Sequence, residues 1–232
     1  MELTKNIAFL VNNYFDQLEY QETFSALLDR GARISVISNE YTDLQAINNF
    51  EFGDKFKADL LISQSSPENF DALVLIGGIV NADRLRSDLK VQEWLLSFLD
   101  NNQPVAAISY APWLLVSAKA VNGRRLTSYF TIREDIVNAG GEWLNSPVVI
   151  DRNLITARNA SDLPYFNYHL INLLNQQNMG SNSYTNSTND FQFFKPNRQY
   201  YLRSRASPSF KRYKLIKKQS LINDIHDSNK SF

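Results

Sequence analysis

Ser109 follows the short apolar run VAAI at positions 105–108, and Tyr110, Ala111 and Pro112 come directly after it. The apolar run predicts a buried strand, and the proline predicts the first turn of a helix. A sharp strand-to-helix turn exposes its side chain at the edge of a sheet, where many α/β hydrolases carry their nucleophile. The Ser109 hydroxyl is therefore the first candidate for chemistry in this sequence.

A serine hydroxyl is not ionised at neutral pH, so it needs a general base within hydrogen-bond reach. One candidate base is Asp16, which follows the first predicted strand. A second arrangement follows the order Ser–Asp–His, with Asp135 or Asp151 and then His169. His169 lies in an apolar helical pattern, which also fits a packed structural histidine. Both arrangements stay open at this point.

A pair of glycines, Gly77-Gly78, ends another apolar run. Its backbone amides could form an anion-binding site, and the same pair also fits a tight turn after a strand. Arg84 and Arg86 follow and could line a carboxylate site or form ion pairs on the surface. No group of His, Asp and Glu has the spacing of metal ligands, so we predict no metal and no cofactor.

The elements that would position these residues alternate between strands and helices, which predicts an α/β fold with a mostly parallel sheet. A hairpin turn is expected at 151–153, and Ser161 or Asp162 is expected to cap the last helix. Strands are predicted at 5–12, 32–38, 71–78, 104–109, 124–129 and 147–158, and helices at 16–30, 89–101 and 161–177.

The chain of 232 residues contains no cysteine, which excludes disulfides, thiolate metal sites and thiol catalysis. It has no apolar run of the length that a membrane helix needs, and its start does not resemble a signal peptide, so we expect a cytoplasmic protein. Residues 1–175 hold 14 Lys and Arg against 21 Asp and Glu, whereas residues 176–232 hold 10 against 3. This asymmetry predicts an acidic body, residues 1–177, and a basic extension, residues 178–232.

The extension begins with a polar, low-complexity stretch and is expected to be largely disordered. Aromatic and basic side chains alternate irregularly over residues 191–218. Such a segment could bind nucleic acid by charge and base stacking, or lie on an anionic membrane. It could also fold back onto the acidic body.

Five stretches of the chain, taken together, resemble the PfpI family of intracellular-protease-like proteins, which includes relatives of the parkinsonism-associated deglycase. The family belongs to the class I glutamine-amidotransferase-like superfamily. The resemblance implies a flavodoxin-like three-layer sandwich and a homodimer or larger homo-oligomer. The matching stretches occur in family order at 7–20, 71–86, 104–118, 123–143 and 153–167.

The resemblance also places the site residues. The family's turn usually reads Ala-Ile-Cys-His-Gly-Pro, so Ser109 stands where the nucleophilic cysteine would be and Tyr110 where the histidine would be. The family's first loop carries a glutamate that interacts with the cysteine, and Asp16 is expected to take its place with a shorter side chain. The pair Gly77-Gly78 is retained.

These substitutions predict a non-catalytic or strongly impaired homologue that binds a small molecule or a partner at a vestigial pocket. The alternative is a weak hydrolase, or an enzyme of the glyoxalase and deglycase type, that uses Ser109 with Asp16. A second alternative is a nucleic-acid or membrane adaptor that works through the basic extension. The expected pocket is lined by Asp16, Gly77, Gly78, Ser109 and Tyr110.

Overall fold

The computed structural model describes residues 3–176. The predictions for residues 178–232, including disorder and contact with nucleic acid or a membrane, fall outside the described residues. Within residues 3–176 the order of elements follows the predicted alternation of strands and helices.

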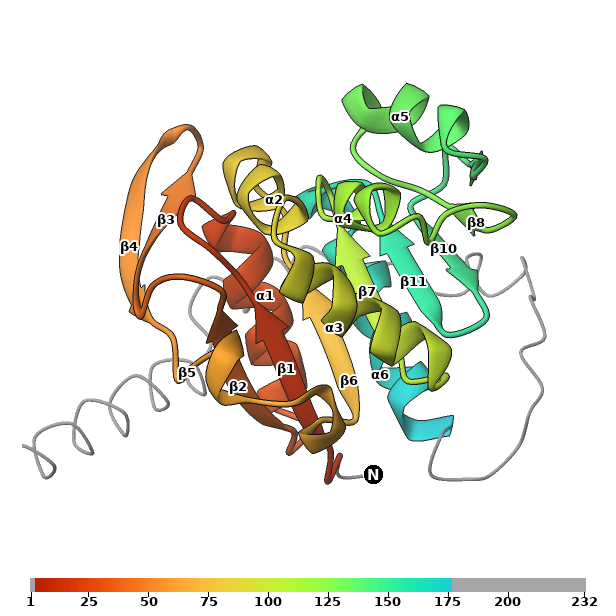
Figure 1. The fold of residues 1–232 in the computed structure, drawn as a ribbon. Helices are drawn as coiled ribbons and strands as arrows, with labels where there is room; N and C mark the ends of the chain where they lie inside the picture. The colour runs from red at the N-terminus through yellow and green to blue at the C-terminus, as the bar shows by residue number, and fades with distance from the viewer. Residues whose placement is uncertain (1–2, 177–232) are drawn as a thin grey trace, which may run out of the picture.

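A seven-stranded sheet forms the centre of the molecule (Figure 1). Six of its strands run parallel, and only the edge strand β10 is antiparallel to its neighbour β11. This confirms the predicted mostly parallel sheet and the hairpin at 151–153. Across the sheet the order is β10 (Val148–Asp151), β11 (Leu154–Ala157), β7 (Val105–Ile108), β6 (Ala72–Leu75), β1 (Asn6–Leu10), β2 (Arg33–Ser38) and β5 (Leu60–Leu61).

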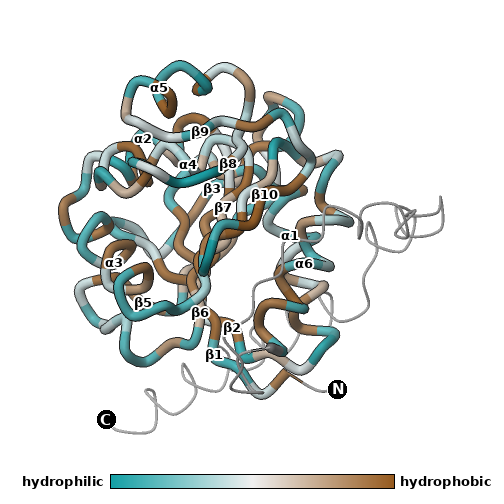
Figure 2. Tube along the Cα trace, turned by 90° about the vertical axis from the view of Figure 1, so that its right-hand side faces the viewer, coloured by the Kyte–Doolittle hydropathy of each residue, from teal (hydrophilic) through white to brown (hydrophobic). Residues whose placement is uncertain are grey.

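Helices cover both faces of this sheet, which gives three layers (Figure 2). One face carries α1 (Gln17–Leu28) and α6 (Leu163–Gln176), which contact each other. The other face carries α2 (Ile79–Arg86), α3 (Leu89–Asp100) and α4 (Pro112–Ser117). The sandwich is flavodoxin-like, as predicted. Within residues 3–176, no helix combines the length and apolar character needed to cross a membrane.

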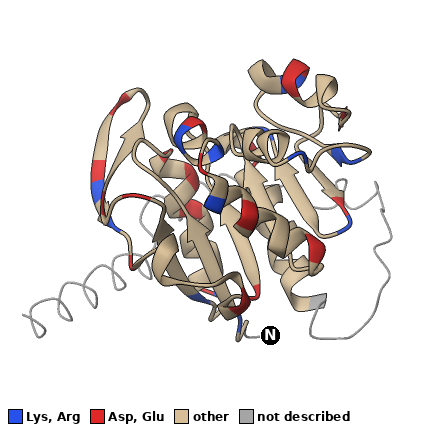
Figure 3. Ribbon diagram, in the orientation of Figure 1, with Lys and Arg blue, Asp and Glu red and all other residues tan. Residues whose placement is uncertain are grey.

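The central strands are apolar on both sides because helices bury both faces. In β1, Ile7 and Phe9 join the core beneath α1 and α6, whereas Ala8 and Leu10 join the core beneath α3. This alternation follows the two-residue period of a strand. Strands β1, β6, β7 and β11 contain no charged residue. Figure 3 shows acidic and basic residues interspersed along the surrounding helices and loops.

Two small sheets lie outside the central one. The antiparallel hairpin β3 (Asp43–Asn48) and β4 (Glu51–Lys57) was not predicted. The strand predicted at 124–129 is present but shorter: β8 spans only Arg125–Leu126 and pairs in parallel with β9 (Glu142–Trp143). Between them lies α5 (Arg133–Asn138), and short 3₁₀ turns occupy Ile62–Gln64, Pro67–Asn69, Phe130–Ile132 and Ala160–Asp162.

The start of the closing helix also differs from the prediction. The capping side chain is Asn159, whose Oδ1 accepts a hydrogen bond from the Ser161 amide, at the 3₁₀ turn that leads into α6. The Asp162 carboxylate instead accepts hydrogen bonds from the Arg158 guanidinium, at 2.8 and 3.0 Å. A cap was therefore correctly expected in this segment, but two residues too late.

Candidate active-site turn around Ser109

Ser109 occupies the predicted sharp turn between β7 and α4. Its φ angle is 63°, a left-handed conformation that costs a non-glycine residue about 1–2 kcal/mol. Two backbone hydrogen bonds hold it there: its amide donates to Ala157 O at 3.0 Å, and its carbonyl accepts from Tyr129 N at 2.8 Å. The side chain is largely buried, with the residue 5% exposed.

The side-chain partner of Ser109 is Glu19, a residue that the sequence analysis missed. The Ser109 hydroxyl donates a hydrogen bond to the Glu19 carboxyl, which also accepts from the Gly77 amide at 2.9 Å. Burial raises the pKa of Glu19 well above its ordinary value, and the neighbouring Asp16 carboxylate raises it further. The two hydrogen bonds offset only part of this shift. Glu19 therefore keeps its proton to a higher pH than an exposed glutamate does.

Asp16 does not take the expected place beside the hydroxyl. Its side chain caps α1 by accepting from the Glu19 amide at 2.9 Å, and its own amide donates to Gly77 O at 3.1 Å. Burial raises its pKa as well, although less than that of Glu19. Within residues 3–176, Ser109 makes its carboxyl contact through Glu19 and not through Asp16. The expectation that pairs Ser109 with Asp16 is corrected accordingly.

The glycine pair is used in two different ways. Residues at the start of α1 bind both backbone polar groups of Gly77. The Gly77 amide donates to the Glu19 carboxyl, and the Gly77 carbonyl accepts from the Asp16 amide. A Cβ atom at Gly77 would lie 2.4 Å from the Glu19 carboxyl and 2.6 Å from Ser109 Cβ. The Gly77 amide is thus engaged by a carboxyl of the chain itself. Gly78, with φ at 99°, is the N-cap of α2.

The Tyr110 side chain packs against another aromatic ring, that of Tyr129. Its ring stacks on that of Tyr129, with centroids 4.7 Å apart and planes inclined by 25°. Its hydroxyl accepts a hydrogen bond from the Thr131 hydroxyl at 3.2 Å. Tyr110 therefore does not replace the family's histidine as a base for the neighbouring hydroxyl.

The alternative triad is not assembled. The His169 ring lies in α6 and packs against the Tyr168 ring, with centroids 5.2 Å apart and planes inclined by 81°. Asp151 accepts from the Arg125 amide at 3.1 Å and pairs with Arg152. Asp151 also lies at the opposite end of β7 from Ser109, because it pairs with Leu154, which in turn pairs with Val105.

The two arginines of α2 form surface ion pairs, which was the second of the two roles expected for them. Arg84 pairs with Glu40 at 3.8 Å, and its guanidinium lies 5.8 Å from the Tyr14 ring centroid. Arg86 pairs with Asp83 at 3.1 Å and lies over the Trp113 ring at 4.1 Å. No group of three or more potential metal-ligating His, Cys, Asp or Glu residues occurs between positions 3 and 176.

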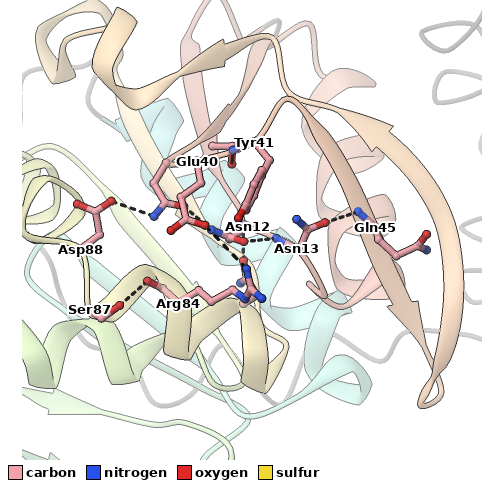
Figure 4. A network of polar contacts seen from close by, with 11 residues as sticks. Asn12, Asn13, Glu40, Tyr41, Gln45, Arg84, Ser87 and Asp88 are labelled. Carbon is pink, nitrogen blue, oxygen red and sulfur yellow. Dashed lines mark hydrogen bonds and ion pairs between the residues drawn. The ribbon is translucent and has the colours of Figure 1, made fainter.

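Asparagines that follow β1 and β2 belong to a polar network next to the glycine pair. Figure 4 shows part of this network. The Asn12 amide donates to Asn81 Oδ1 at 2.6 Å, and the Asn81 side-chain amide donates to the carbonyls of Ile76 and Gly77. The Asn12 side chain continues through Asn39 to Asp88. This chain of neutral amides fixes the loop that carries Gly77, and no local sequence pattern predicts it.

Comparison with known proteins agrees with this architecture. A family model described as the DJ-1/PfpI family matches residues 5–173. The putative cysteine protease YraA of Bacillus subtilis is 34% identical over 174 residues, which cover 74% of this chain and 99% of the relative. Deglycase PfpI of Pyrococcus furiosus is 34% identical over 168 residues, which cover 72% and 98%. Schizosaccharomyces pombe DJ-1 has a similar fold, with a TM-score of 0.65 at 16% identity over 77% of this chain and 99% of that one.

Proposed function

Because the chain belongs to the DJ-1/PfpI family, we propose that it is a non-catalytic or strongly impaired member that binds a small molecule at the Ser109 turn. The observation that carries this proposal is the contact between the Ser109 hydroxyl and the buried Glu19 carboxyl. Because the pKa of Glu19 is raised, more of this carboxyl is protonated at a given pH than of an exposed glutamate, and the protonated form cannot accept the serine proton.

The other groups at the turn do not restore activation. Tyr110 hydrogen-bonds Thr131 and stacks on Tyr129. The Gly77 amide is bound to Glu19 and is not available to stabilise a developing oxyanion. In a serine protease, loss of the nucleophile or its base lowers the rate by about 10⁶-fold. We expect a comparable deficit here, with the folded frame of the site intact.

The frame itself supports ligand binding. Ser109 is held in a left-handed conformation by the two backbone hydrogen bonds to Ala157 and Tyr129. Glu19 and Gly77 are fixed by reciprocal contacts with the first turn of α1. A preorganised group of this kind binds without a large entropy loss, since little of the site has to be ordered by the ligand.

The test compares the wild type with Ser109→Ala, Ser109→Cys and the double variant Ser109→Cys, Tyr110→His, using methylglyoxal and an activated ester as substrates. We expect the wild type and Ser109→Ala to show the same background rate. The double variant should exceed both, because a thiol ionises far more readily than a hydroxyl. Wild-type turnover that disappears in Ser109→Ala would contradict the proposal.

A second candidate is a slow hydrolase or deglycase, and the Ser109–Glu19 contact is the observation that favours it. Here Glu19 replaces Asp16 as the base, and it could act only where it is ionised. The rate would then rise with pH above the raised pKa of Glu19 and vanish in Glu19→Gln. A pH profile of ester hydrolysis for these two proteins separates this candidate from the first.

Assembly is a further part of the proposal. Two phenylalanines of the β3–β4 hairpin, Phe50 and Phe52, are exposed by 102% and 76%. Apolar side chains of this size on a surface support association between copies of the chain. Sedimentation velocity of the wild type and of the double variant Phe50→Ser, Phe52→Ser should show a homodimer or larger species only for the wild type.

The alternative of an adaptor that works through the basic extension has its own test. Binding to DNA and to anionic vesicles is measured for the protein with and without residues 178–232.

A further inference from the structure

Two tyrosines beside the Ser109 turn form a stacked pair, referred to below as the Tyr110–Tyr129 pair. Their ring planes are nearly parallel and their centroids are 4.7 Å apart. Tyr110 is partly buried, whereas Tyr129 is 38% exposed. The pair therefore presents aromatic surface to the solvent within one residue of the Ser109 hydroxyl.

Three features hold this pair at the Ser109 turn. Tyr110 directly follows Ser109 in the chain, and the Tyr129 amide donates to Ser109 O at 2.8 Å. The Thr131 hydroxyl donates to the Tyr110 hydroxyl at 3.2 Å, which restrains the ring. Because both rings are held in place, a ligand that stacks on them would not have to order them.

The aromatic surface continues into the next residues. Phe130 follows Tyr129 and is 67% exposed, and its ring meets Trp143 edge to face at 6.1 Å. The Trp143 indole nitrogen donates to the Ser128 hydroxyl at 3.0 Å, so this ring is also restrained. Exposed aromatic side chains held rigidly beside a buried polar group are typical of small-molecule sites, in which apolar walls surround a few polar groups.

We propose that the Ser109 turn binds a planar aromatic ligand, whose ring stacks on Tyr129. This inference rests on the proposed binding function and names the class of ligand. Parallel stacking of the two tyrosines favours a flat ring, since a third ring extends the same arrangement.

The absence of cysteine from the sequence allows a direct test. Ser109→Cys introduces a single thiol at the turn, which can be alkylated by N-phenylmaleimide or by N-cyclohexylmaleimide. The two reagents share their carbonyls and differ in whether the ring is aromatic. The ratio of their rate constants, measured by intact mass spectrometry, is divided by the same ratio for N-acetylcysteine to remove intrinsic reactivity.

We expect this normalised ratio, N-phenylmaleimide over N-cyclohexylmaleimide, to be about five, which is in the range that aromatic stacking provides. Tyr129→Ala and Tyr129→Leu, each in the Ser109→Cys background, should return it to about one, whereas Tyr129→Phe should keep it. Tyr168→Ala removes a comparably exposed tyrosine on α6 and serves as the matched control, with no change expected. Circular dichroism of each variant checks that the fold is retained.

A normalised ratio near one in Ser109→Cys would overturn the proposal. So would a raised ratio that persists in the folded Tyr129→Leu variant, or a thiol that neither reagent reaches. None of these results depends on turnover. They leave the non-catalytic assignment standing, because that assignment is decided by the substrate assays of Ser109→Ala and of the Cys-His double variant.

Discussion

Two regions of this molecule that contain left-handed backbone differ sharply, namely the Ser109 turn and the tip of the β3–β4 hairpin. At the turn, Ser109 has φ at 63° and Gly78 has φ at 99°. At the hairpin tip, Asn49 and Phe50 have φ at 49° and 69°. The conformations are similar, but the first region is packed and hydrogen-bonded, whereas Phe50 is fully exposed.

The difference shows which strained residues are fixed by their surroundings. Ser109 is held by backbone hydrogen bonds on both sides and by Glu19. Phe50 occupies a two-residue hairpin turn, in which glycine is preferred because it adopts positive φ without cost. Strain at the turn is therefore maintained by the fold, while strain at the hairpin tip is a local cost that a substitution can remove.

The largest effect should come from Gly78→Ala. A Cβ atom there would lie 2.6 Å from Tyr14 O and 2.9 Å from Phe15 Cα, both backbone atoms that cannot move independently. We expect a loss of more than about 3 kcal/mol in the free energy of unfolding, measured by urea titration. Gly123→Ala is the matched control, since Gly123 also has positive φ but has nothing within 4 Å of the added atom. It should cost only about 1 kcal/mol. Equal losses would contradict the packing argument.

Asn81→Ala should come next. It leaves the buried Asn12 amide and the carbonyls of Ile76 and Gly77 without their side-chain partner. We expect a loss of about 2–3 kcal/mol in the same titration, because buried polar groups without partners are costly. Asn101→Ala, at an exposed position on the end of α3, should stay within about 0.5 kcal/mol. A mild effect of Asn81→Ala would show that the asparagine network does not hold the Gly77 loop.

A smaller, pH-dependent effect is expected of Glu19→Gln. Folding raises the pKa of Glu19, so its contribution to stability is complete below the unfolded value near 4.5 and is lost as pH rises toward the raised value. In that window the wild type should lose up to about 1.4 kcal/mol per pH unit relative to Glu19→Gln. Asp16 is present in both proteins, and its electrostatic coupling to Glu19 forms part of this difference. A difference that stays constant with pH would mean that Glu19 ionises like an exposed glutamate.

The smallest effect, of opposite sign, should come from Phe50→Gly at the hairpin tip. The substitution produces the Asn-Gly pair that such turns prefer and removes an unfavourable φ from an exposed residue. We expect the free energy of unfolding to rise by about 0.5–1 kcal/mol, seen as a higher midpoint of thermal unfolding. Because this residue could also contribute to assembly, the comparison is made at several protein concentrations. A loss of stability at every concentration would remove the proposed contrast between the two regions.

Sequence reasoning was most successful where the signal was local. The apolar runs predicted the central strands, and the strand–turn–helix pattern predicted the Ser109 turn. It failed at Glu19 because the family's first-loop glutamate was matched to Asp16, three residues earlier in the chain. In the structure the Asp16 side chain caps α1, and the Glu19 carboxyl turns toward Gly77 N and Ser109.

The other failures have the same origin in distant contacts. The β3–β4 hairpin turns at Asn49-Phe50, a pair without the glycine that signals such turns. Asn12, Asn39 and Asn81 are far apart in the chain, and only the fold brings them into one network. A useful signal would have been the carboxylate three residues after a helix cap, considered together with a glycine pair at the end of a neighbouring strand.

The hydroxyl at the Ser109 turn has one further consequence. A low-pKa thiol at such a position is converted by hydrogen peroxide to sulfenic acid and then to higher oxidation states. An alcohol does not enter this series, and the sequence contains no cysteine. Whatever occupies this turn should therefore bind equally well before and after exposure of the protein to peroxide.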